Sequence, residues 1–277
     1  MDTIKKIFRG NFIEKTLALM PKSPESFLGR IVPGNYLYSK GSVRSVKRND
    51  IAMKLDISEY GQHYVYFNYT DLSLKALLEL AKPGMVVYDI GCNIGWTSLN
   101  LAKKVTAEGI VYAFEPDPVN FKIAQYNVAL NSQYNNIVIE NIGLGAKKGE
   151  FKLFQVDDKN IGMRQIREDA DSAFSLVQVE ILDEYLKRVP GLIKIDTEGY
   201  EMNILKGAIN VLKKYSPALF IEVDDNNLRI QKSSAGELIE FLASLNYTVF
   251  EAEHNTKVLP TDNFTNCHFD VVCQPLK

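Results

Sequence analysis

The chain carries the sequence DIGCNIGW at residues 89–96, directly after the short apolar segment Val86–Ile90. The apolar segment predicts a buried strand, and Trp96–Lys104 predicts the helix that follows it. Glycines at positions 91 and 95 allow a tight strand-to-helix turn and let a ligand approach the backbone. The N–H groups at the start of that helix form a positive dipole end. The turn therefore predicts a binding site for a nucleotide-like ligand.

The spacing of this turn differs from the common phosphate-binding motifs. The dinucleotide pattern G-x-G-x-x-G and the P-loop pattern G-K-[ST] are both absent. Asp89 stands two residues before the first glycine, where it would repel a pyrophosphate. It favours a cationic ligand such as S-adenosylmethionine, which carries a sulfonium, an ammonium and a ribose but no phosphate. Glu115 ends the next predicted strand, Ile110–Phe114, and a carboxylate there accepts hydrogen bonds from both ribose hydroxyls.

Strands and helices alternate over the rest of the chain. Strands that are apolar on both faces are typical of a parallel sheet covered by helices, so we expect a doubly wound, Rossmann-like α/β fold. The last two predicted strands, Tyr247–Ala252 and Phe269–Cys273, have no clear helix between them and predict an antiparallel hairpin at the sheet edge. The other predicted strands are Ile137–Glu140, Leu192–Ile195 and Ala218–Val223, and the other predicted helices are Val119–Leu130, Glu201–Lys214 and Leu238–Leu245.

Two segments depart from this alternation. Residues 1–80 are rich in Pro and Gly at their start, and we expect an N-terminal extension with short helices and a β-hairpin. Its predicted strands are Met53–Ile57 and Tyr64–Tyr69, joined around Gly61. Residues 157–171, between two further predicted strands, are polar and read as irregular. They predict either a substrate-contacting lid or a solvated connection.

The composition narrows the class of protein. The 277 residues include 32 Lys+Arg and 34 Asp+Glu, a net charge of −2 that does not support nucleic-acid binding. Hydrophobic residues make up 46% and charged residues 24%, as in an ordinary globular protein. Three cysteines without a disulfide framework indicate a reducing compartment. With no clear signal peptide and no apolar run long enough for a transmembrane segment, we expect a cytoplasmic protein.

Several motifs downstream of residue 88 extend this pattern. They are Asp89–Gly95, Glu115-Pro116-Asp117-Pro118 with Phe121, Asn127 and Asn131, Leu182-Asp183, and IKIDTEGYE at 193–201 running into Leu205-Lys206-Gly207. With these motifs, the chain from about Lys54 onward resembles the FkbM family of S-adenosylmethionine-dependent methyltransferases. The string at 193–201 is the most specific part of the resemblance.

The resemblance implies an O-methyltransferase that acts on a hydroxyl of a sugar, glycan or polyketide-like natural product. Because the alternation of strands and helices begins after the N-terminal extension, we expect the S-adenosylmethionine-binding domain in residues 81–277. Alternatives are a nucleic-acid or other N-methyltransferase, a nicotinamide-dependent oxidoreductase, and a non-catalytic nucleotide-binding module. The implied cofactor contacts are Asp89, Gly91, Asn93 and Gly95 at the methionine end, Glu115 at the ribose and Asn141 near the adenine.

Carboxylates gather after the fourth and fifth predicted strands, at the sheet edge where ligands of α/β proteins bind. Lys194 and Asp196 share one strand face, Glu222 lies on the next strand, and Glu198 follows in a turn. Methyl transfer needs the acceptor atom and the methyl group to be aligned. A hydroxyl is a poor nucleophile, so a base or a metal often assists it.

Three interpretations stay open for these carboxylates. The first is a general base, with Asp196, Glu198 and Glu222 as the catalytic candidates. The second is a divalent cation, possible but not predicted, held by hard oxygen ligands from Asp196, Glu198, Glu222, Asp224 and Asp225. The third is a buried ion pair of Lys194, with Asp196 or Glu198 capping the next helix. His254, in an expected loop, is an outside candidate for the base.

Overall fold

The computed structural model describes residues 9, 12–157, 160–167 and 175–276. Residue contacts divide the chain into two compact units. The N-terminal unit comprises residues 1–71 and 156–163, and the sheet unit comprises residues 72–155 and 164–277. None of the described helices is long and apolar enough to cross a membrane.

The N-terminal unit contains short helices and one antiparallel hairpin. The hairpin turns at Asn49 and Asp50, whose φ values of 47° and 67° are those of a tight hairpin turn. The predicted strand over Tyr64–Tyr69 is wrong, because its first half belongs to helix α4, whose buried side chains His63 and Tyr66 lie at helical spacing. The elements are α2 (Phe12–Leu19), α3 (Phe27–Ile31), η1 (Asn35–Leu37), β1 (Val43–Arg48), β2 (Ile51–Asp56) and α4 (Tyr60–Tyr66).

The sheet unit is built on an eight-stranded mixed sheet with the order β13-β12-β14-β11-β10-β3-β4-β5. The strands from β11 to β5 are parallel, as predicted, whereas β14 is antiparallel to both of its neighbours. The strands are β3 (Val86–Ile90), β4 (Ile110–Phe114), β5 (Ile137–Glu140), β10 (Leu192–Ile195), β11 (Ala218–Asp224), β12 (Tyr247–Glu251), β13 (Lys257–Val258) and β14 (His268–Pro275).

The expected edge hairpin is confirmed only in its pairing. Strands β12 and β14 are antiparallel neighbours, but β14 lies inside the sheet between β11 and β12, and β13 forms the edge. Val271 and Cys273 of β14 have no exposed surface, and an apolar strand gains more burial between two neighbours than at an edge.

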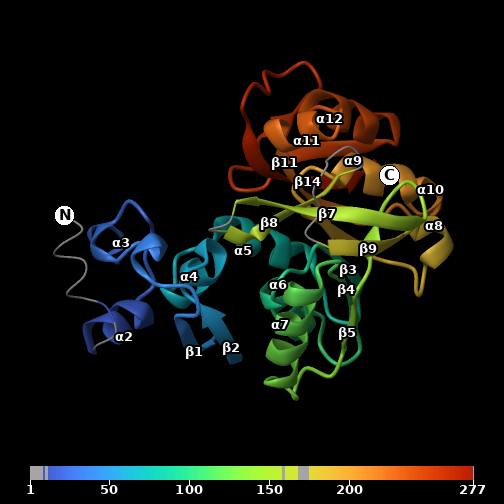
Figure 1. Ribbon diagram of the computed structural model, residues 1–277. Coiled ribbons are helices and arrows are strands. Elements are labelled where there is room, and N and C mark those ends of the chain that lie inside the picture. Colours follow the sequence, from blue (N-terminus) through green and yellow to red (C-terminus); the bar gives the residue numbers. More distant parts are fainter. Residues whose placement is uncertain (1–8, 10–11, 158–159, 168–174, 277) are drawn as a thin grey trace. The chain divides into compact units, whose positions relative to one another are not determined.

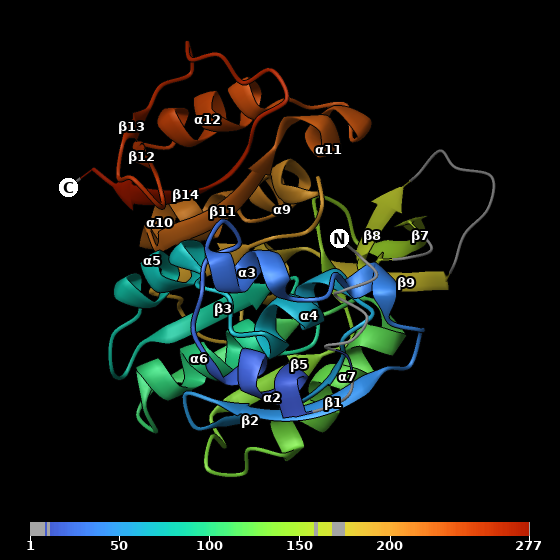
Figure 2. The ribbon, with the colours of Figure 1, turned by 90° about the vertical axis from the view of Figure 1, so that its left-hand side faces the viewer.

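Helices cover both faces of this sheet (Figures 1 and 2). Side chains alternate along β3, so that Val87 packs toward α5 and α6 while Tyr88 packs toward the opposite helices. The predicted helix at 201–214 is two helices separated at Ala208. One face carries α5 (Leu72–Leu80), α6 (Trp96–Val105) and α7 (Pro118–Ala129). The other face carries α8 (Leu182–Tyr185), α9 (Glu201–Gly207), α10 (Ile209–Tyr215), α11 (Asp225–Ile230) and α12 (Ala235–Ser244).

A second sheet has the order β6-β9-β7-β8 and packs through Leu144, Leu153 and Val177 on the core beneath α9. The irregular structure expected for residues 157–171 is wrong for 160–167, which form β8, because strand pairing overrides the polar local sequence. Residues 158–159 and 168–171 of that interval lie outside the described residues. The strands are β6 (Gly143–Leu144), β7 (Gly149–Asp157), β8 (Asn160–Arg167) and β9 (Ser175–Glu180).

Candidate cofactor and acceptor site

The glycine turn joins β3 to α6 at the carboxyl edge of the sheet. Gly91 and Gly95 have φ values of +81° and +83°, a region that favours glycine. A Cβ on Gly91 would lie 1.8 Å from the carbonyl oxygen of Asp196, so the turn abuts the backbone that follows β10. The N-cap residue of α6 is Gly95, which has no side chain to cap the helix. Its first N–H groups therefore suit an anionic group of a ligand, such as a carboxylate.

Asp89 supports this turn from inside the protein. Its side chain is fully buried, accepts a 2.6 Å hydrogen bond from Ser98 Oγ and lies 3.2 Å from Lys194 Nζ. Lys194 also donates to the carbonyl of Gly91 at 2.8 Å and pairs with Asp196 at 3.1 Å. Burial opposes the charge of Lys194, but the two carboxylates outweigh it and raise its pKa. The predicted buried ion pair is confirmed.

Glu115 follows β4 and lies beside the turn. Its Oε2 accepts a 2.8 Å hydrogen bond from Asn93 N, and its Oε1 accepts a 3.0 Å bond from Asp117 N. Each carboxylate oxygen can accept a second hydrogen bond, as two ribose hydroxyls require. Burial raises the pKa of Glu115 to about 8. Asn141 donates to the carbonyls of Glu115 and Pro116 at 2.8 and 3.0 Å, and so fixes the backbone here.

The six predicted cofactor residues thus gather at the ends of β3, β4 and β5. Their chemistry fits S-adenosylmethionine. Glu115 suits a diol, the N-terminal turn of α6 suits a carboxylate, and the acids suit a cation. The charge of Lys194 is taken up by two carboxylates, so Lys194 is not placed to hold a pyrophosphate. The individual roles, including that of Asn141 at the adenine, stay predictions.

The predicted catalytic carboxylates come together at the ends of β10 and β11. Burial, followed by repulsion from Asp196, raises the pKa of Glu198 to about 7 and that of Glu222 well above its usual value. Glu198 has a φ of +56°, unusual for a residue with a side chain, and its Oε2 accepts a 2.9 Å hydrogen bond from Asn227. Among the described residues, the basic side chains that contact these acids are Lys194, at Asp196, and His268, 3.6 Å from Glu222.

The expected helix cap by Asp196 or Glu198 is wrong. Helix α9 has no side-chain cap at its N-cap residue. Instead, Glu201 from its first turn accepts hydrogen bonds from Thr197 N, Thr197 Oγ1 and Gly199 N at 3.0, 2.9 and 3.0 Å. Glu201 therefore holds the loop that carries Glu198. Within the described parts of the chain, no group of three or more His, Cys, Asp or Glu side chains could hold a metal ion.

The sequence analysis did not propose His268 for this site. His268 Nδ1 lies 2.9 Å from Asp224 Oδ2, and Nε2 lies 3.6 Å from Glu222 Oε1. Burial opposes protonation of His268, but the bond to Asp224 and nearby acids outweigh it and raise the pKa. Only the pairing of β14 with β11 brings His268 here. His254, the outside candidate, is exposed and lies 2.8 Å from Glu251 in its own turn.

Strand β8 adds two further residues that the sequence analysis missed. Arg164 forms a buried ion pair with Asp117, the N-cap residue of α7 and a neighbour of Glu115. Gln165 Nε2 donates a 2.9 Å hydrogen bond to Asn227 Oδ1, and Asn227 in turn holds Glu198. Arg164 therefore contacts the part of the site around Asp89 and Glu115, here called the cofactor side. Its neighbour Gln165 contacts the part around Asp196, Glu198 and Glu222, here called the acceptor side. Their only sequence signal was their position in the interval interpreted as a lid or a connection.

The sheet order, the glycine turn and the acid after the second parallel strand define a Rossmann-like α/β protein of the class I methyltransferase type. The family model of the methyltransferase FkbM domain matches residues 89–249, which is more than half of the chain. The protein belongs to this family.

Two curated relatives and one solved structure illustrate the range of similarity. The hexuronic acid methyltransferase AglP of Haloferax volcanii is 25% identical over 141 residues, 50% of this chain and 56% of the relative. Methyltransferase 1 of Beauveria bassiana is 28% identical over 144 residues, 44% of this chain and 57% of the relative. The match thus spans a little over half the length of these relatives. The FkbM methyltransferase structure from Methylobacillus flagellatus KT has a TM-score of 0.48 at 16% identity, over 76% of this chain and 52% of that chain.

Proposed function

We propose that the protein is an S-adenosylmethionine-dependent O-methyltransferase acting on a hydroxyl of a sugar, glycan or polyketide-like natural product. The observation that carries this proposal is the placement of Glu115 beside the glycine turn, at the same sheet edge as the acid group Asp196, Glu198 and Glu222. Membership of the FkbM family and the name of the hexuronic acid methyltransferase support it. The activity is assigned to residues 81–277.

The chain binds the cofactor with its backbone and one carboxylate. The turn at 91–95 and the first N–H groups of α6 hold the methionine end, and Glu115 accepts from the ribose hydroxyls. When bound there, S-adenosylmethionine would supply the electrophilic methyl group for the acceptor hydroxyl. The chain aligns the acceptor and removes its proton.

Glu198 is the proposed proton acceptor. A general base works best when its pKa lies near the operating pH, and the pKa of Glu198 is about 7. Asn227 fixes its carboxylate by a 2.9 Å hydrogen bond. Asp196 acts on Glu198 through its charge and links it to Lys194 and the cofactor turn, and Glu198 in turn helps to raise the pKa of Glu222.

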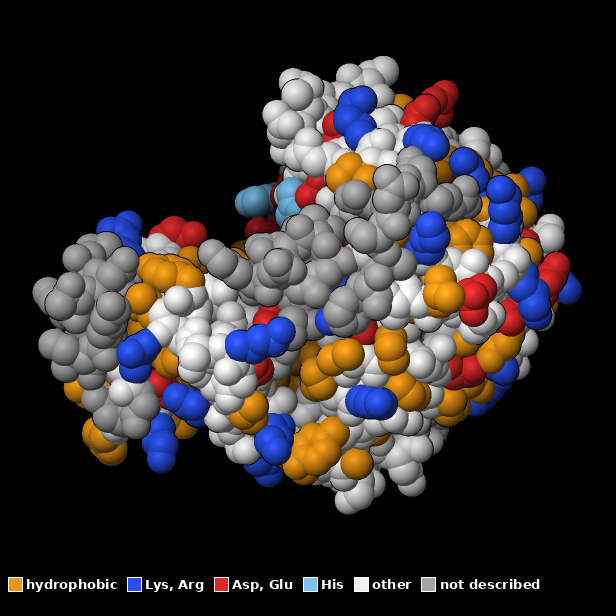
Figure 3. All heavy atoms as spheres, in the orientation of Figure 1, with side chains coloured by type: hydrophobic (Ala, Val, Ile, Leu, Met, Phe, Trp, Pro, Cys, Tyr) orange, Lys and Arg blue, Asp and Glu red, His pale blue; other side chains and the backbone are white. Residues whose placement is uncertain are grey.

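A nucleic-acid acceptor has less support. On the face shown in Figure 3, basic and acidic side chains of the described residues are interspersed and form no continuous basic surface. Proteins that bind a polyanion usually gather Lys and Arg on one face or along one helix. This distribution, with the net charge of −2, favours a small-molecule or glycan acceptor.

The first test is thermal unfolding with S-adenosylmethionine, S-adenosylhomocysteine and NAD in parallel. A ligand at 100 times its dissociation constant adds about 2.7 kcal/mol of stability, and we expect this shift from the two adenosyl ligands alone. A shift with NAD alone would overturn the cofactor assignment. Transfer of radiolabelled methyl groups to a panel of glycosides and hydroxylated natural products then tests the reaction itself.

The second test addresses the base. Glu198→Gln retains a carbonyl oxygen for Asn227 but cannot accept the proton, so kcat should fall by at least about 100-fold. Binding of S-adenosylhomocysteine should be unchanged. His254→Gln is the control, because His254 also pairs with a glutamate but lies beyond β12. Full turnover by the Glu198 variant would remove Glu198 from the catalytic role.

A further inference from the structure

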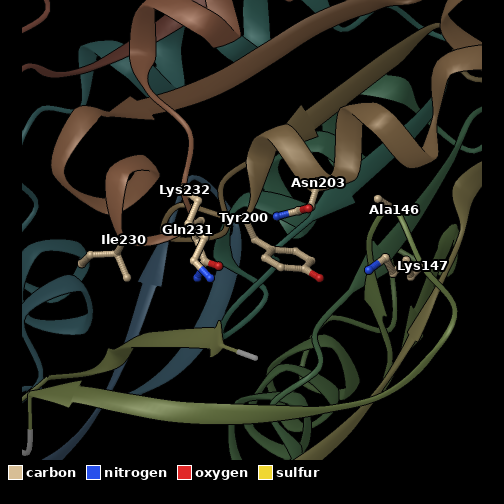
Figure 4. Close-up of a pocket in the computed structure, with 7 residues that line it drawn as sticks. All are labelled: Ala146, Lys147, Tyr200, Asn203, Ile230, Gln231 and Lys232. Carbon is tan, nitrogen blue, oxygen red and sulfur yellow. The ribbon is translucent and has the colours of Figure 1, made fainter. Parts of the chain in front are cut away.

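A pocket of about 200 Å³ lies on the helix α9 side of the sheet unit (Figure 4). Three segments line it: Ala146 and Lys147 after β6, Tyr200 and Asn203 at the start of α9, and residues 230–232 at the end of α11. Sites for drug-sized ligands measure about 300–1,000 Å³, so this volume suits a smaller group such as one monosaccharide unit.

The pocket offers cationic and hydrogen-bonding groups. Among the described residues, its lining includes Lys147 and Lys232 and no carboxylate. Figure 4 shows Lys147 on one side of the pocket and Gln231 and Lys232 on the other. Gln231 Nε2 donates to the carbonyl of Ile166 at 2.6 Å, which leaves its carbonyl oxygen to accept from a ligand hydroxyl. Ammonium groups bind carboxylates and phosphates through charge-assisted hydrogen bonds, so this lining suits an anion that also carries hydroxyls.

The walls of this pocket continue from the elements that hold Glu198. Tyr200 directly follows the loop that carries Glu198, and α11 contributes both Asn227 and the residues at 230–232. A Cβ on Gly145 would lie 2.8 Å from Cε1 of Tyr200, so the glycine lets the Tyr200 ring form this wall. A ligand seated here is thus held by the same loop and helix that position the proposed base.

The geometry points to an anion subsite: this pocket binds a carboxylate or phosphate group of the methyl acceptor, and the acceptor is therefore an acidic sugar or sugar phosphate. The assignment of the anion to the methyl acceptor rests on the proposed function. Binding of the anion itself depends only on the pocket.

Binding to the full chain without cofactor tests the subsite, with titrations followed by the backbone amide signals of Ala146, Lys147 and Asn203 in an ¹⁵N-labelled sample. The probes are methyl β-D-glucuronide for a carboxylate, methyl β-D-glucoside 6-phosphate for a phosphate, and methyl β-D-glucoside as the neutral analogue. We expect one or both anionic probes to bind, and the stronger one identifies the source of the charge. The neutral analogue should bind at least tenfold more weakly.

A double variant and its control test whether Lys147 and Lys232 bind the anion. Lys147→Gln combined with Lys232→Gln should weaken the anionic probe at least tenfold. Lys148→Gln is the matched control, because Lys148 is the sequence neighbour but pairs with Glu180 at 2.9 Å and does not line the pocket. All variants should bind S-adenosylhomocysteine equally. The subsite is overturned if no anionic probe binds the unmodified protein, or if the double variant binds as tightly. Anion binding without any methyl transfer would instead count against the proposed function.

Discussion

Two groups of carboxylates share one edge of the sheet but are held in different ways. On the cofactor side, Asp89 and Glu115 each receive hydrogen bonds or an ion pair from fixed donors, among them Ser98 Oγ and Asn93 N. On the acceptor side, Glu198 and Glu222 are buried among other acids, and burial, followed by repulsion from these acids, raises their pKa values. At Glu115 the donors oppose the rise in pKa that burial causes, whereas at Glu198 and Glu222 repulsion from the neighbouring acids adds to it. The difference separates binding from proton transfer.

The two groups of carboxylates meet at Gly91, and we expect a substitution of this glycine to have the largest effect, a loss of folding stability. Gly91→Ala places a Cβ 1.8 Å from the backbone oxygen of Asp196, so the turn and the loop after β10 must separate. We expect a loss of about 4 kcal/mol or more in the free energy of unfolding, measured by denaturant titration. Gly95→Ala is the control. Its nearest contact is 3.5 Å away, and its positive φ alone should cost about 1–2 kcal/mol. Equal losses in the two variants would contradict the close approach.

The second-largest effect is expected on cofactor affinity, from a substitution on the cofactor side alone. Glu115→Ala removes the acceptor of two backbone N–H groups and of the ribose hydroxyls, and charge-assisted hydrogen bonds contribute about 1.5–3 kcal/mol each. S-adenosylhomocysteine should bind roughly 100-fold more weakly by calorimetry. Glu140→Gln, at the end of the next strand and bonded to Tyr185, should bind it normally. Unchanged affinity in the Glu115 variant would remove the ribose assignment.

The candidate acids on both sides of the site were named from the sequence, but their long-range partners were not. The turn at 89–96 and Glu115 are read from local signals, because glycine spacing and an acid after a strand are visible within about 30 residues. His268 reaches Asp224 only through the antiparallel pairing of β14 with β11. Arg164 reaches Asp117 only because β8 pairs into a second sheet. Long-range strand pairing has no local sequence signature, so these contacts required the structure.

The third prediction tests the crowding of the acceptor side. The pKa of Glu222 is raised in the folded protein, so the stability that its protonated form supports is present below about pH 4 and is lost as pH rises through the folded pKa. Glu222→Gln should therefore be more stable than the unmodified protein at pH 8. The gain should vanish near pH 4.

Denaturant titrations at the two pH values measure this effect. Glu240→Gln, an exposed position on α12, is the control and should change stability little at either pH. If the Glu222 variant is less stable than the unmodified protein at pH 8, neighbouring groups stabilise the charge of Glu222 in the unmodified protein and do not destabilise it.

The smallest effect concerns the pH dependence of cofactor affinity. Because burial raises the pKa of Glu115 to about 8, the carboxylate that accepts the ribose hydroxyls forms as pH rises from 7 to 9. Affinity for S-adenosylhomocysteine should rise about tenfold over this interval, a gain of about 1.4 kcal/mol. The rise should be absent in Glu115→Gln. A flat profile in the unmodified protein would mean that both protonation states bind the ribose equally.

Because β14 lies between β11 and β12, it determines the order in which these strands can pair while the chain is being synthesised. Residue 224 ends β11, but its partner strand begins only at residue 268. At roughly 5–20 residues per second, the ribosome leaves the edges of β11 and β12 unpaired for a few seconds. Unpaired strand edges are the places where nascent chains associate wrongly. The same late strand delivers His268 to Asp224, so the acceptor side of the site is completed only after the cofactor side has been synthesised.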